Sequence, residues 1–409
     1  MSQLRKPTFV ISIIVALACV LFSVLAYRVI IMGGRVQVQT APNTALTPLP
    51  NLKATATATS KASLIKLPAQ DPSAILGVDA NNPSNDYPGI PWVRLGYISC
   101  GSGNLQGQTL RNIIQNYHKQ NIRVLLTYCQ RGDNASLYDT APLQDVATAN
   151  ADAVQCGNEE MKQDASVSFL YVQPDHFARF YDLCERAVHA VRSDIPVLLG
   201  SLDPHVGGVD YQPLVDQADY LDQMQDAMNT TVHPGGNWNW HTQILGLIDS
   251  WHNGYPDSSV NSLAGLFSFW ADKFQVDLNS GQLGKHLWVV EGTGCFKGCG
   301  IDASDPAQVA ISHVLTLTTD VQTSMQYKVP FFYFSGIDFF DQGIVWPIGI
   351  LDANGHPKPL RQDLPMGARK LTLSCPGNKS VTVQDQEQLL AQMYAHCALP
   401  SNYQSTLTS

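Results

Sequence analysis

Eight short apolar runs, separated by longer segments with helical spacing, constrain the fold of this chain most strongly. The runs are "AILGVDA" from residue 74, "WVRLGYIS" from 92, "IRVLLTYC" from 122, "DAVQCGNE" from 152, "PVLLGS" from 196, "ILGLIDSWH" from 244, "HLWVVEGTG" from 286 and "PFFYFSGID" from 330. Each run contains β-branched or aromatic residues, and half of them end in Gly, Ser or Asp. Between them, segments such as "HFARFYDLCERAVHAVRS" place apolar residues three or four positions apart. Continuous apolar strands that alternate with helices indicate a parallel sheet covered on its faces.

Eight such units between residues 74 and 364 predict an α/β fold, a (β/α)8 TIM barrel. The connection between residues 80 and 92 is too short for a full helix, so we expect the barrel to be least regular there. An open, doubly wound sheet is the alternative fold. It would need a glycine-rich phosphate loop after an early strand, and "GSGNLQG" from residue 101 is the only candidate. A lone glycine run of this kind is weak evidence, so the barrel is favoured.

The N-terminus contains an uncharged apolar segment, "FVISIIVALACVLFSVLAY", at residues 9–27. As a helix it would span about 28 Å, close to the thickness of the hydrocarbon layer of a membrane. With Arg5 and Lys6 before it, it predicts a transmembrane signal anchor within residues 1–32, with the large downstream domain outside the cell. The alternative is a secretory signal peptide cleaved near residues 24–26, which would release the protein.

The rest of the chain divides into three predicted parts. Residues 33–70 are rich in Thr, Ala and Pro and have no aromatic residue, which predicts a flexible tether. Residues 71–364 form the predicted barrel domain. Residues 365–409 form a polar tail, in which "EQLLAQMYAHC" predicts a short amphipathic helix.

Composition narrows the choice of compartment and partners. Only 14% of residues are charged and the formal net charge is -9, so nucleic acid and anionic membrane surfaces are disfavoured as partners. Nine cysteines occur, of which Cys19 lies inside the apolar segment. The other eight form an even set, which is typical of disulfides in an oxidising compartment. Residues 295 and 299 could close a tight loop, and residues 375 and 397 could link the tail. No CxxC pair occurs, so we expect no metal site.

The strand ends carry the residues that suggest chemistry. In a parallel barrel the carboxyl ends of the strands meet at one mouth. The fourth run ends in Asn158 and Glu159, the seventh in Glu291, and the second carries Arg94. Two carboxylates across a barrel mouth suit the cleavage of a glycosidic bond, because one can donate a proton while the other attacks the anomeric carbon. Burial and mutual repulsion would raise the pKa of one of them, which separates the two roles.

These residues also have plainer interpretations. Glu159 could be a carboxylate that stabilises a helix N-terminus, and Glu160 beside it could equally be the important residue. Arg94 could pair with a carboxylate inside the barrel; next to Glu291, it would keep that carboxylate ionised. Trp238 lies with Trp240 in a glycine-rich loop, "HPGGNWNWH", and we favour a sugar-stacking platform over packing there.

An Asn-Glu pair after strand four and a Glu at the end of strand seven resemble the clan A (β/α)8 retaining glycoside hydrolases, the cellulase and β-mannanase-like superfamily. The resemblance covers roughly residues 74–364, and residues 345–364, "VWPIGILDANGHPKPLRQDL", are similar to the usual end of these enzymes. It implies that Glu159 is the acid/base and Glu291 the nucleophile. It also implies that the Asn before the acid/base, Asn158, and the strand-two arginine, Arg94, bind substrate.

Further substrate-binding residues are expected from strands six and eight. The resemblance implies His252 and Tyr255 after strand six, and Trp251 beside them is a further expected contact. Strand eight often ends in a Trp in this clan, whereas here "FFYFSGID" offers Phe334 and Trp346 lies further on. We include Trp346 among the expected contacts.

The sequence therefore predicts a membrane-anchored extracellular glycoside hydrolase that cleaves β-glycosidic bonds with retention of configuration. We expect an oligo- or polysaccharide substrate, no metal or organic cofactor, and a monomer. The alternative is a catalytically inactive barrel that binds carbohydrate at the cell surface. A hydrolase requires paired carboxylates at the barrel mouth, and a binding barrel does not.

Overall fold

The computed structural model describes residue 67 and residues 75–400, with gaps at 81, 102, 163–170, 204–211, 251–261, 295–305, 342 and 361–369. All of these residues belong to the second of two compact units, Ala62–Ser409. The predicted anchor at 1–32, and all of the predicted tether except residue 67, lie outside the described residues. Within the described part of the chain, no helix combines the length and the apolar character needed to span a bilayer.

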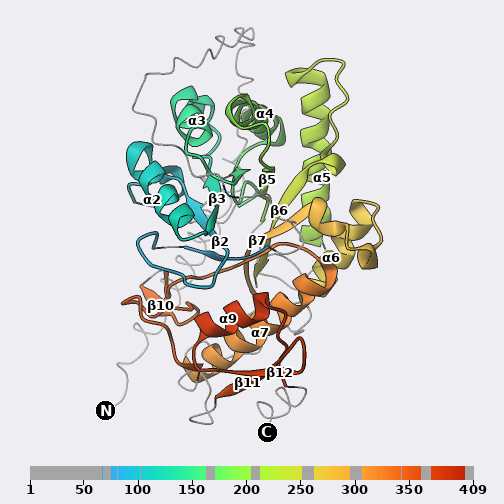
Figure 1. Ribbon diagram of the computed structural model, residues 1–409. Helices are drawn as coiled ribbons and strands as arrows, with labels where there is room; N and C mark the ends of the chain where they lie inside the picture. Colours follow the sequence, from blue (N-terminus) through green and yellow to red (C-terminus); the bar gives the residue numbers. More distant parts are fainter. Residues whose placement is uncertain are drawn as a thin grey trace, which may run out of the picture. The chain divides into compact units, whose positions relative to one another are not determined.

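Eight parallel strands form a closed barrel in chain order (Figure 1). They are β1 (Leu76–Asp79), β2 (Trp92–Gly96), β3 (Arg123–Tyr128), β4 (Ala153–Cys156), β5 (Val197–Ser201), β6 (Ile244–Ser250), β7 (Leu287–Gly294) and β8 (Phe331–Tyr333). Each strand pairs with the next, and β8 pairs back with β1, so the ring closes. The predicted (β/α)8 barrel is confirmed, all eight runs supply strands, and the open-sheet alternative is wrong.

Helices follow most of the strands and surround the ring (Figure 1). The longer ones are α2 (Gly107–Lys119), α3 (Thr140–Ala147), α4 (Pro174–Val191), α5 (Gln212–Ala227), α6 (Ser262–Lys273) and α7 (Pro306–Tyr327). Shorter 3-10 or π turns are η2 (Ile98–Cys100), η3 (Ala135–Tyr138), η5 (Met228–Val232), η6 (Trp240–Thr242), η7 (Leu278–Ser280) and η8 (Leu283–Lys285). The described residues between β1 and β2 contain no helix, which confirms the expected irregularity at that connection.

The interior of the barrel is filled by a cluster separate from the core under the helices. Its buried members come from β2, β3, β4, β5, β7 and β8 and from the residue before β1: Ile75, Trp92, Leu125, Ala153, Leu198, Trp288, Val290 and Phe332. Trp288 stacks on Phe332 with ring centroids 6.4 Å apart, and Trp92 meets both rings edge-on. A Cβ at Gly77 of β1 would lie 2.5 Å from the Phe332 ring. Only glycine at this position allows β1 to lie so close to the aromatic cluster inside the barrel. The packed interior is typical of such barrels and leaves the strand ends for a site.

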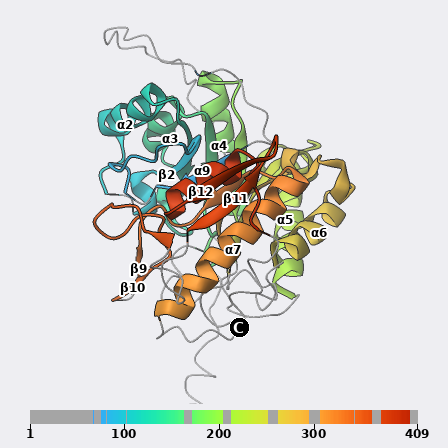
Figure 2. The same ribbon diagram turned by 60° about the horizontal axis from the view of Figure 1, so that its bottom comes forward.

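The C-terminal residues form small elements beside the barrel: β9 (Phe339–Asp341), β10 (Ile344–Trp346), β11 (Leu371–Cys375), β12 (Lys379–Val383) and α9 (Gln386–Tyr394). Both views place β11, β12 and α9 next to α7 (Figure 2). Leu389, Leu390 and Met393 of α9 are buried in the same core as the barrel helices. The predicted amphipathic helix is thus confirmed, and the tail packs as part of the barrel unit.

Three disulfides lie within the described part of the chain. Cys100–Cys129 links η2 to the end of β3, Cys156–Cys184 links β4 to α4, and Cys375–Cys397 links β11 to the chain after α9. The predicted pairing in the tail is confirmed. Residues 295 and 299, for which a tight loop was considered, lie outside the described residues.

The tail disulfide should contribute to stability because it closes a loop of 22 residues. Replacing both Cys375 and Cys397 with Ser should lower the free energy of unfolding by about 3 kcal/mol, measured by urea denaturation followed by circular dichroism. The exposed side chain of Ser374 provides the control, because Ser374→Ala should leave the urea midpoint unchanged. Equal midpoints for the double variant and the wild type would show that the link adds nothing.

Candidate active site

The end of β4 is shaped by left-handed backbone and by hydrogen bonds to β5. Gly157 has φ 100° and Glu159 has φ 55°, an uncommon conformation for a non-glycine residue. The N–H of Glu159 donates to the carbonyl of Ser201 over 2.7 Å, and the N–H of Met161 donates to the carbonyl of Leu202 over 2.9 Å. The turn therefore continues along the end of β5 and fixes the backbone that carries Asn158 and Glu159.

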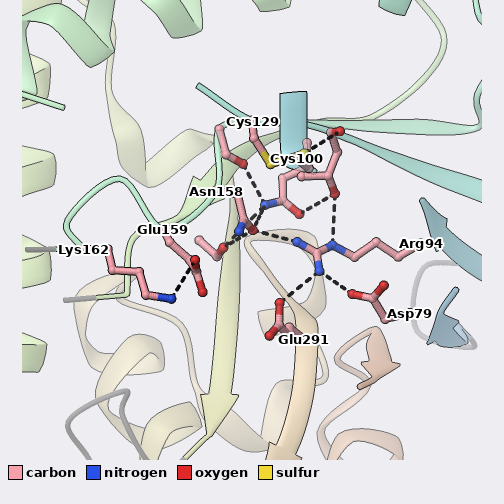
Figure 3. Close-up of polar contacts among 12 residues, drawn as sticks. Asp79, Arg94, Cys100, Cys129, Asn158, Glu159, Lys162 and Glu291 are labelled. Carbon is pink, nitrogen blue, oxygen red and sulfur yellow. Dashed lines mark hydrogen bonds and ion pairs between the residues drawn. A yellow bond between two sulfur atoms is a disulfide. The ribbon is translucent and has the colours of Figure 1, made fainter. Parts of the chain in front are cut away.

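Arg94 of β2 joins the predicted site residues through its guanidinium. Nη2 donates to Oδ1 of Asn158 over 2.7 Å, and Nη1 donates to Oε2 of Glu291 over 3.1 Å. Nε donates to Oγ1 of Thr127 over 3.0 Å. One planar cation thus contacts groups from β3, the end of β4, and β7. The structure brings Arg94, Asn158 and Glu291 together as the sequence predicts, and in the view of Figure 3 Glu159 lies between Lys162 and Glu291.

Asp79, at the end of β1, completes this array and was missed by the sequence analysis. Its Oδ2 accepts a hydrogen bond of 2.5 Å from Nη1 of Arg94, the same nitrogen that contacts Glu291. Burial raises the pKa of Asp79, and the guanidinium of Arg94 opposes that rise without cancelling it. For Arg94, burial works against the charge, but the two carboxylates dominate and raise its pKa. The only sequence signal for Asp79 was its position at the end of the first apolar run.

Asn158 is held by a dense set of bonds that orient its amide. Besides Arg94, its Oδ1 accepts from Oγ of Ser201 over 2.9 Å and from Nε2 of Gln155 over 3.1 Å. Its backbone N–H and carbonyl both bond the side-chain amide of Gln130, over 2.9 and 2.7 Å. With Oδ1 committed to donors, the amide nitrogen of Asn158 makes no hydrogen bond to the described residues and can donate to a ligand.

Glu159 forms an ion pair with Lys162, another residue that the sequence analysis missed. Nζ of Lys162 lies 2.9 Å from Oε2 of Glu159, and both side chains are about one-eighth exposed. Burial works against the charge of Lys162, but Glu159 and Asp203 raise its pKa. Lys162 is three residues after Glu159, a spacing that could have suggested this contact.

Glu160 points away from the mouth, in contrast to Glu159. Its side chain is completely buried in the wall between β4 and β5. Burial raises the pKa of Glu160 to about 8, and the charges of Glu159 and Asp203 add to that rise. Of the two adjacent glutamates considered from the sequence, Glu159 is the one that forms an ion pair, with Lys162 (Figure 3).

The end of β8 presents a small aromatic cluster. Phe334 meets Phe339 edge-on at 4.9 Å, and both pack against Trp346 and Ile348. Trp346, predicted as a substrate contact, is only 6% exposed, so packing accounts for its position. Below this cluster, Asp338 forms an ion pair with Nζ of Lys358 at 3.0 Å.

The predicted stacking platform in the loop before β6 is wrong for Trp240, whereas Trp238 is only partly buried. Trp240 is 2% exposed, packs edge-on against Trp270 and Phe274, and donates its indole N–H to Asp222 over 2.9 Å. Trp238 packs against the core beside Tyr181.

Three further predicted contacts, Trp251, His252 and Tyr255, lie outside the described residues. Within the described part of the chain, no group of three or more His, Cys, Asp or Glu side chains is placed to hold a metal ion.

Comparison with known proteins gives structural likeness only. No protein-family model and no curated protein matches this chain. Among solved structures, the Ignisphaera aggregans GH53 catalytic domain has a TM-score of 0.44 at 13% identity, covering 74% of this chain and 98% of that one. The virulence factor SghA from Agrobacterium tumefaciens has a TM-score of 0.43 at 12% identity, covering 77% and 83%. The catalytic domain of a mannanase from Streptomyces sp. SirexAA-E has a TM-score of 0.38 at 14% identity, covering 65% and 71%.

The predicted resemblance to the clan A barrels is confirmed for the fold by the closed parallel ring of eight strands. At these identities and scores, the likeness carries no argument about activity. Conclusions about chemistry therefore rest on the side chains of this chain.

Removing the buried guanidinium should be costly, because it leaves the carboxylates of Asp79 and Glu291 without their cation. Arg94→Met should lower the free energy of unfolding by about 3 kcal/mol or more at pH 7. Adding Asp79→Asn to that variant should recover part of the loss. The measurement is urea unfolding.

A matched control is Arg111→Met, because Arg111 forms an ion pair with Asp145 but is one-third exposed. Its loss should be below about 1 kcal/mol. Equal losses for the two arginine variants would contradict the central role assigned to Arg94.

Proposed function

We propose that this protein is a membrane-anchored extracellular glycoside hydrolase that cleaves β-glycosidic bonds with retention of configuration. The observation that carries the proposal is the contact of one guanidinium with both Asn158 and Glu291. This contact joins the ends of β4 and β7, and so brings the backbone of Glu159 and the carboxylate of Glu291 to one mouth. Paired carboxylates in that position suit glycoside hydrolysis.

Glu291 is the proposed nucleophile. The positive charge of Arg94, 3.1 Å from Oε2, favours the ionised carboxylate that attack requires. A carboxylate oxygen attacks the anomeric carbon while the bond to the leaving oxygen breaks, which forms a glycosyl ester on Glu291.

Glu159 is the proposed acid/base. In the first step its carboxyl proton passes to the leaving oxygen; in the second it removes a proton from the water that cleaves the ester. Lys162, 2.9 Å from Oε2, holds one oxygen of this carboxylate in place. The fixed turn at the end of β4 limits the remaining freedom of the side chain.

Asn158 supplies orientation. Its oxygen accepts three hydrogen bonds, which leaves its amide nitrogen as the donor for a ligand. A sugar hydroxyl is a suitable acceptor, and a hydrogen bond there would hold the ring during both steps. The substrate class that fits is a β-linked oligo- or polysaccharide.

The catalytic assignment is tested on a panel of aryl β-glycosides. Glu291→Gln should lower kcat/KM by about 10⁴-fold or more, because the amide cannot form the glycosyl ester. Glu159→Gln should lower it by roughly 10²- to 10⁴-fold for a poor leaving group, and much less for dinitrophenol, which needs no proton. Nuclear magnetic resonance of the first product should show the β-anomer.

Glu185→Gln is the matched control, because Glu185 is a partly buried glutamate of α4 away from the mouth. It should retain full activity. Full hydrolysis by Glu291→Gln would overturn the hydrolase assignment, whereas tight glycan binding without cleavage by the wild type would favour the binding barrel.

The anchor is tested separately, in cells. The full chain should sediment with membranes and resist carbonate extraction, and deletion of residues 1–32 should release it. Mature protein that starts after residue 26 and accumulates in the medium would contradict the anchor and favour a cleaved signal peptide.

A further inference from the structure

Glu160 is a buried carboxyl that has no side-chain hydrogen-bond partner among the described residues. Its side chain is 0% exposed, and neither Oε1 nor Oε2 has a partner within the part of the chain that the structure describes. Burying an unpaired polar group costs free energy, and burying an unpaired charge costs far more. A carboxyl kept in such a place is therefore expected to be neutral and to serve a purpose.

The carboxyl occupies a notch made by two glycines. A Cβ at Gly157 would lie 1.9 Å from Oε1 of Glu160, and a Cβ at Gly200 would lie 1.7 Å from the same atom. A side chain at either position would force the carboxyl to move. Gly200 has ordinary backbone geometry, so the space it leaves is the property that matters there.

The position of Glu160 in this notch also sets the direction of the Glu159 side chain. Glu159 and Glu160 are adjacent, and the left-handed backbone at Glu159 separates their directions. Glu160 is also held through its carbonyl, which accepts from the N–H of Val172 over 2.9 Å. With the Glu160 side chain in the notch, the Glu159 carboxylate is presented to Lys162 and the mouth.

We infer that Glu160 is a positioning residue: its neutral carboxyl, seated between Gly157 and Gly200, holds the turn that carries Glu159, and its ionisation displaces the acid/base. This inference rests on the proposed function. It predicts a loss of activity at alkaline pH that originates in a residue that does not touch the substrate.

The charged and titratable neighbours of Glu160 are consistent with that behaviour. Three titratable groups interact with it: Glu159 on the same turn, Asp203 after β5 and Tyr220 of α5. Lys162 pairs with Glu159 instead. Burial raises the pKa of Glu160 from 4.5 to about 8; its own backbone N–H opposes the rise, and the charges of Glu159 and Asp203 add to it. Tyr220 has a pKa well above 10 because of burial, so it does not titrate in the same range.

The decisive measurement is the hydrolysis of the isolated glycosyl-enzyme, trapped with a dinitrophenyl 2-deoxy-2-fluoro-β-glycoside from the panel. In that species Glu291 is esterified and cannot titrate, and Glu159 acts as a base, so its own ionisation cannot slow the step as pH rises. A fall in rate above pH 8 must then come from another group.

In the wild type the rate should fall about tenfold by pH 9, because about a tenth of a group with a pKa near 8 remains protonated there. Glu160→Gln should react as fast as the wild type at pH 6.5 and lose less than about twofold at pH 9, since an amide cannot ionise. Glu387→Gln is the matched control. Burial raises the pKa of Glu387 to about 7, but it lies on α9, so its removal should leave the alkaline fall unchanged.

A second variant tests the notch itself. Gly200→Ala should slow the reaction roughly tenfold to a hundredfold at every pH, because the methyl group occupies the place of the carboxyl. Adding Glu160→Ala to Gly200→Ala should restore part of the rate. An unchanged alkaline fall in Glu160→Gln, or full activity of Gly200→Ala, would overturn the inference.

Stability gives a readout that does not depend on activity. Because folding raises the pKa of Glu160, the stability that this group contributes is present below pH 4.5 and is lost as pH rises toward 8. The wild type should therefore lose more unfolding free energy than Glu160→Gln between pH 5 and 8. If no glycoside traps the enzyme, the proposed function fails; parallel pH curves for the two proteins would instead refute the buried neutral carboxyl.

Discussion

The buried guanidinium of Arg94 is the interaction on which the candidate site depends. It contacts Asp79, Thr127, Asn158 and Glu291, which come from four different strands or strand ends. A buried cation is stable only while it is paired. Displacement of one of these strands would leave a buried charge uncompensated and would lower the free energy of unfolding. Closure of the barrel and assembly of the site are therefore one event. These contacts explain why the cation is an arginine. The planar guanidinium donates hydrogen bonds from three nitrogens in different directions, whereas lysine has a single ammonium group.

Much of this arrangement could be predicted from sequence because it follows from local patterns and one geometric rule. The eight apolar runs are continuous, as expected for strands buried on both faces, and each supplies a strand of the ring. Once the strands are parallel, their carboxyl ends must meet. That rule alone brings Arg94, Asn158 and Glu291 together from positions up to 197 residues apart.

The residues that were missed depend on distances that the sequence does not contain. Asp79 looks like any polar residue at the end of a strand until the ring places it against Arg94. Trp240 lies in a polar, glycine-rich loop, yet its ring is buried against Trp270, a contact between η6 and α6 that loop composition cannot reveal. The same holds for Cys156–Cys184, because pairing depends on how α4 returns over β4.

The end of β4 shows how a barrel wall can orient a side chain that it does not touch. Glu159 and Glu160 are adjacent, and the left-handed backbone at Glu159 sends one side chain to the mouth and the other into the wall. The wall accepts a carboxyl because Gly157 and Gly200 leave space, and burial without a described hydrogen-bond partner favours its neutral form. The unpaired group costs stability, but it couples the position of Glu159 to one protonation event. A leucine in the notch would remove the cost and the coupling together, so what distinguishes the carboxyl from an apolar side chain there is its effect on Glu159.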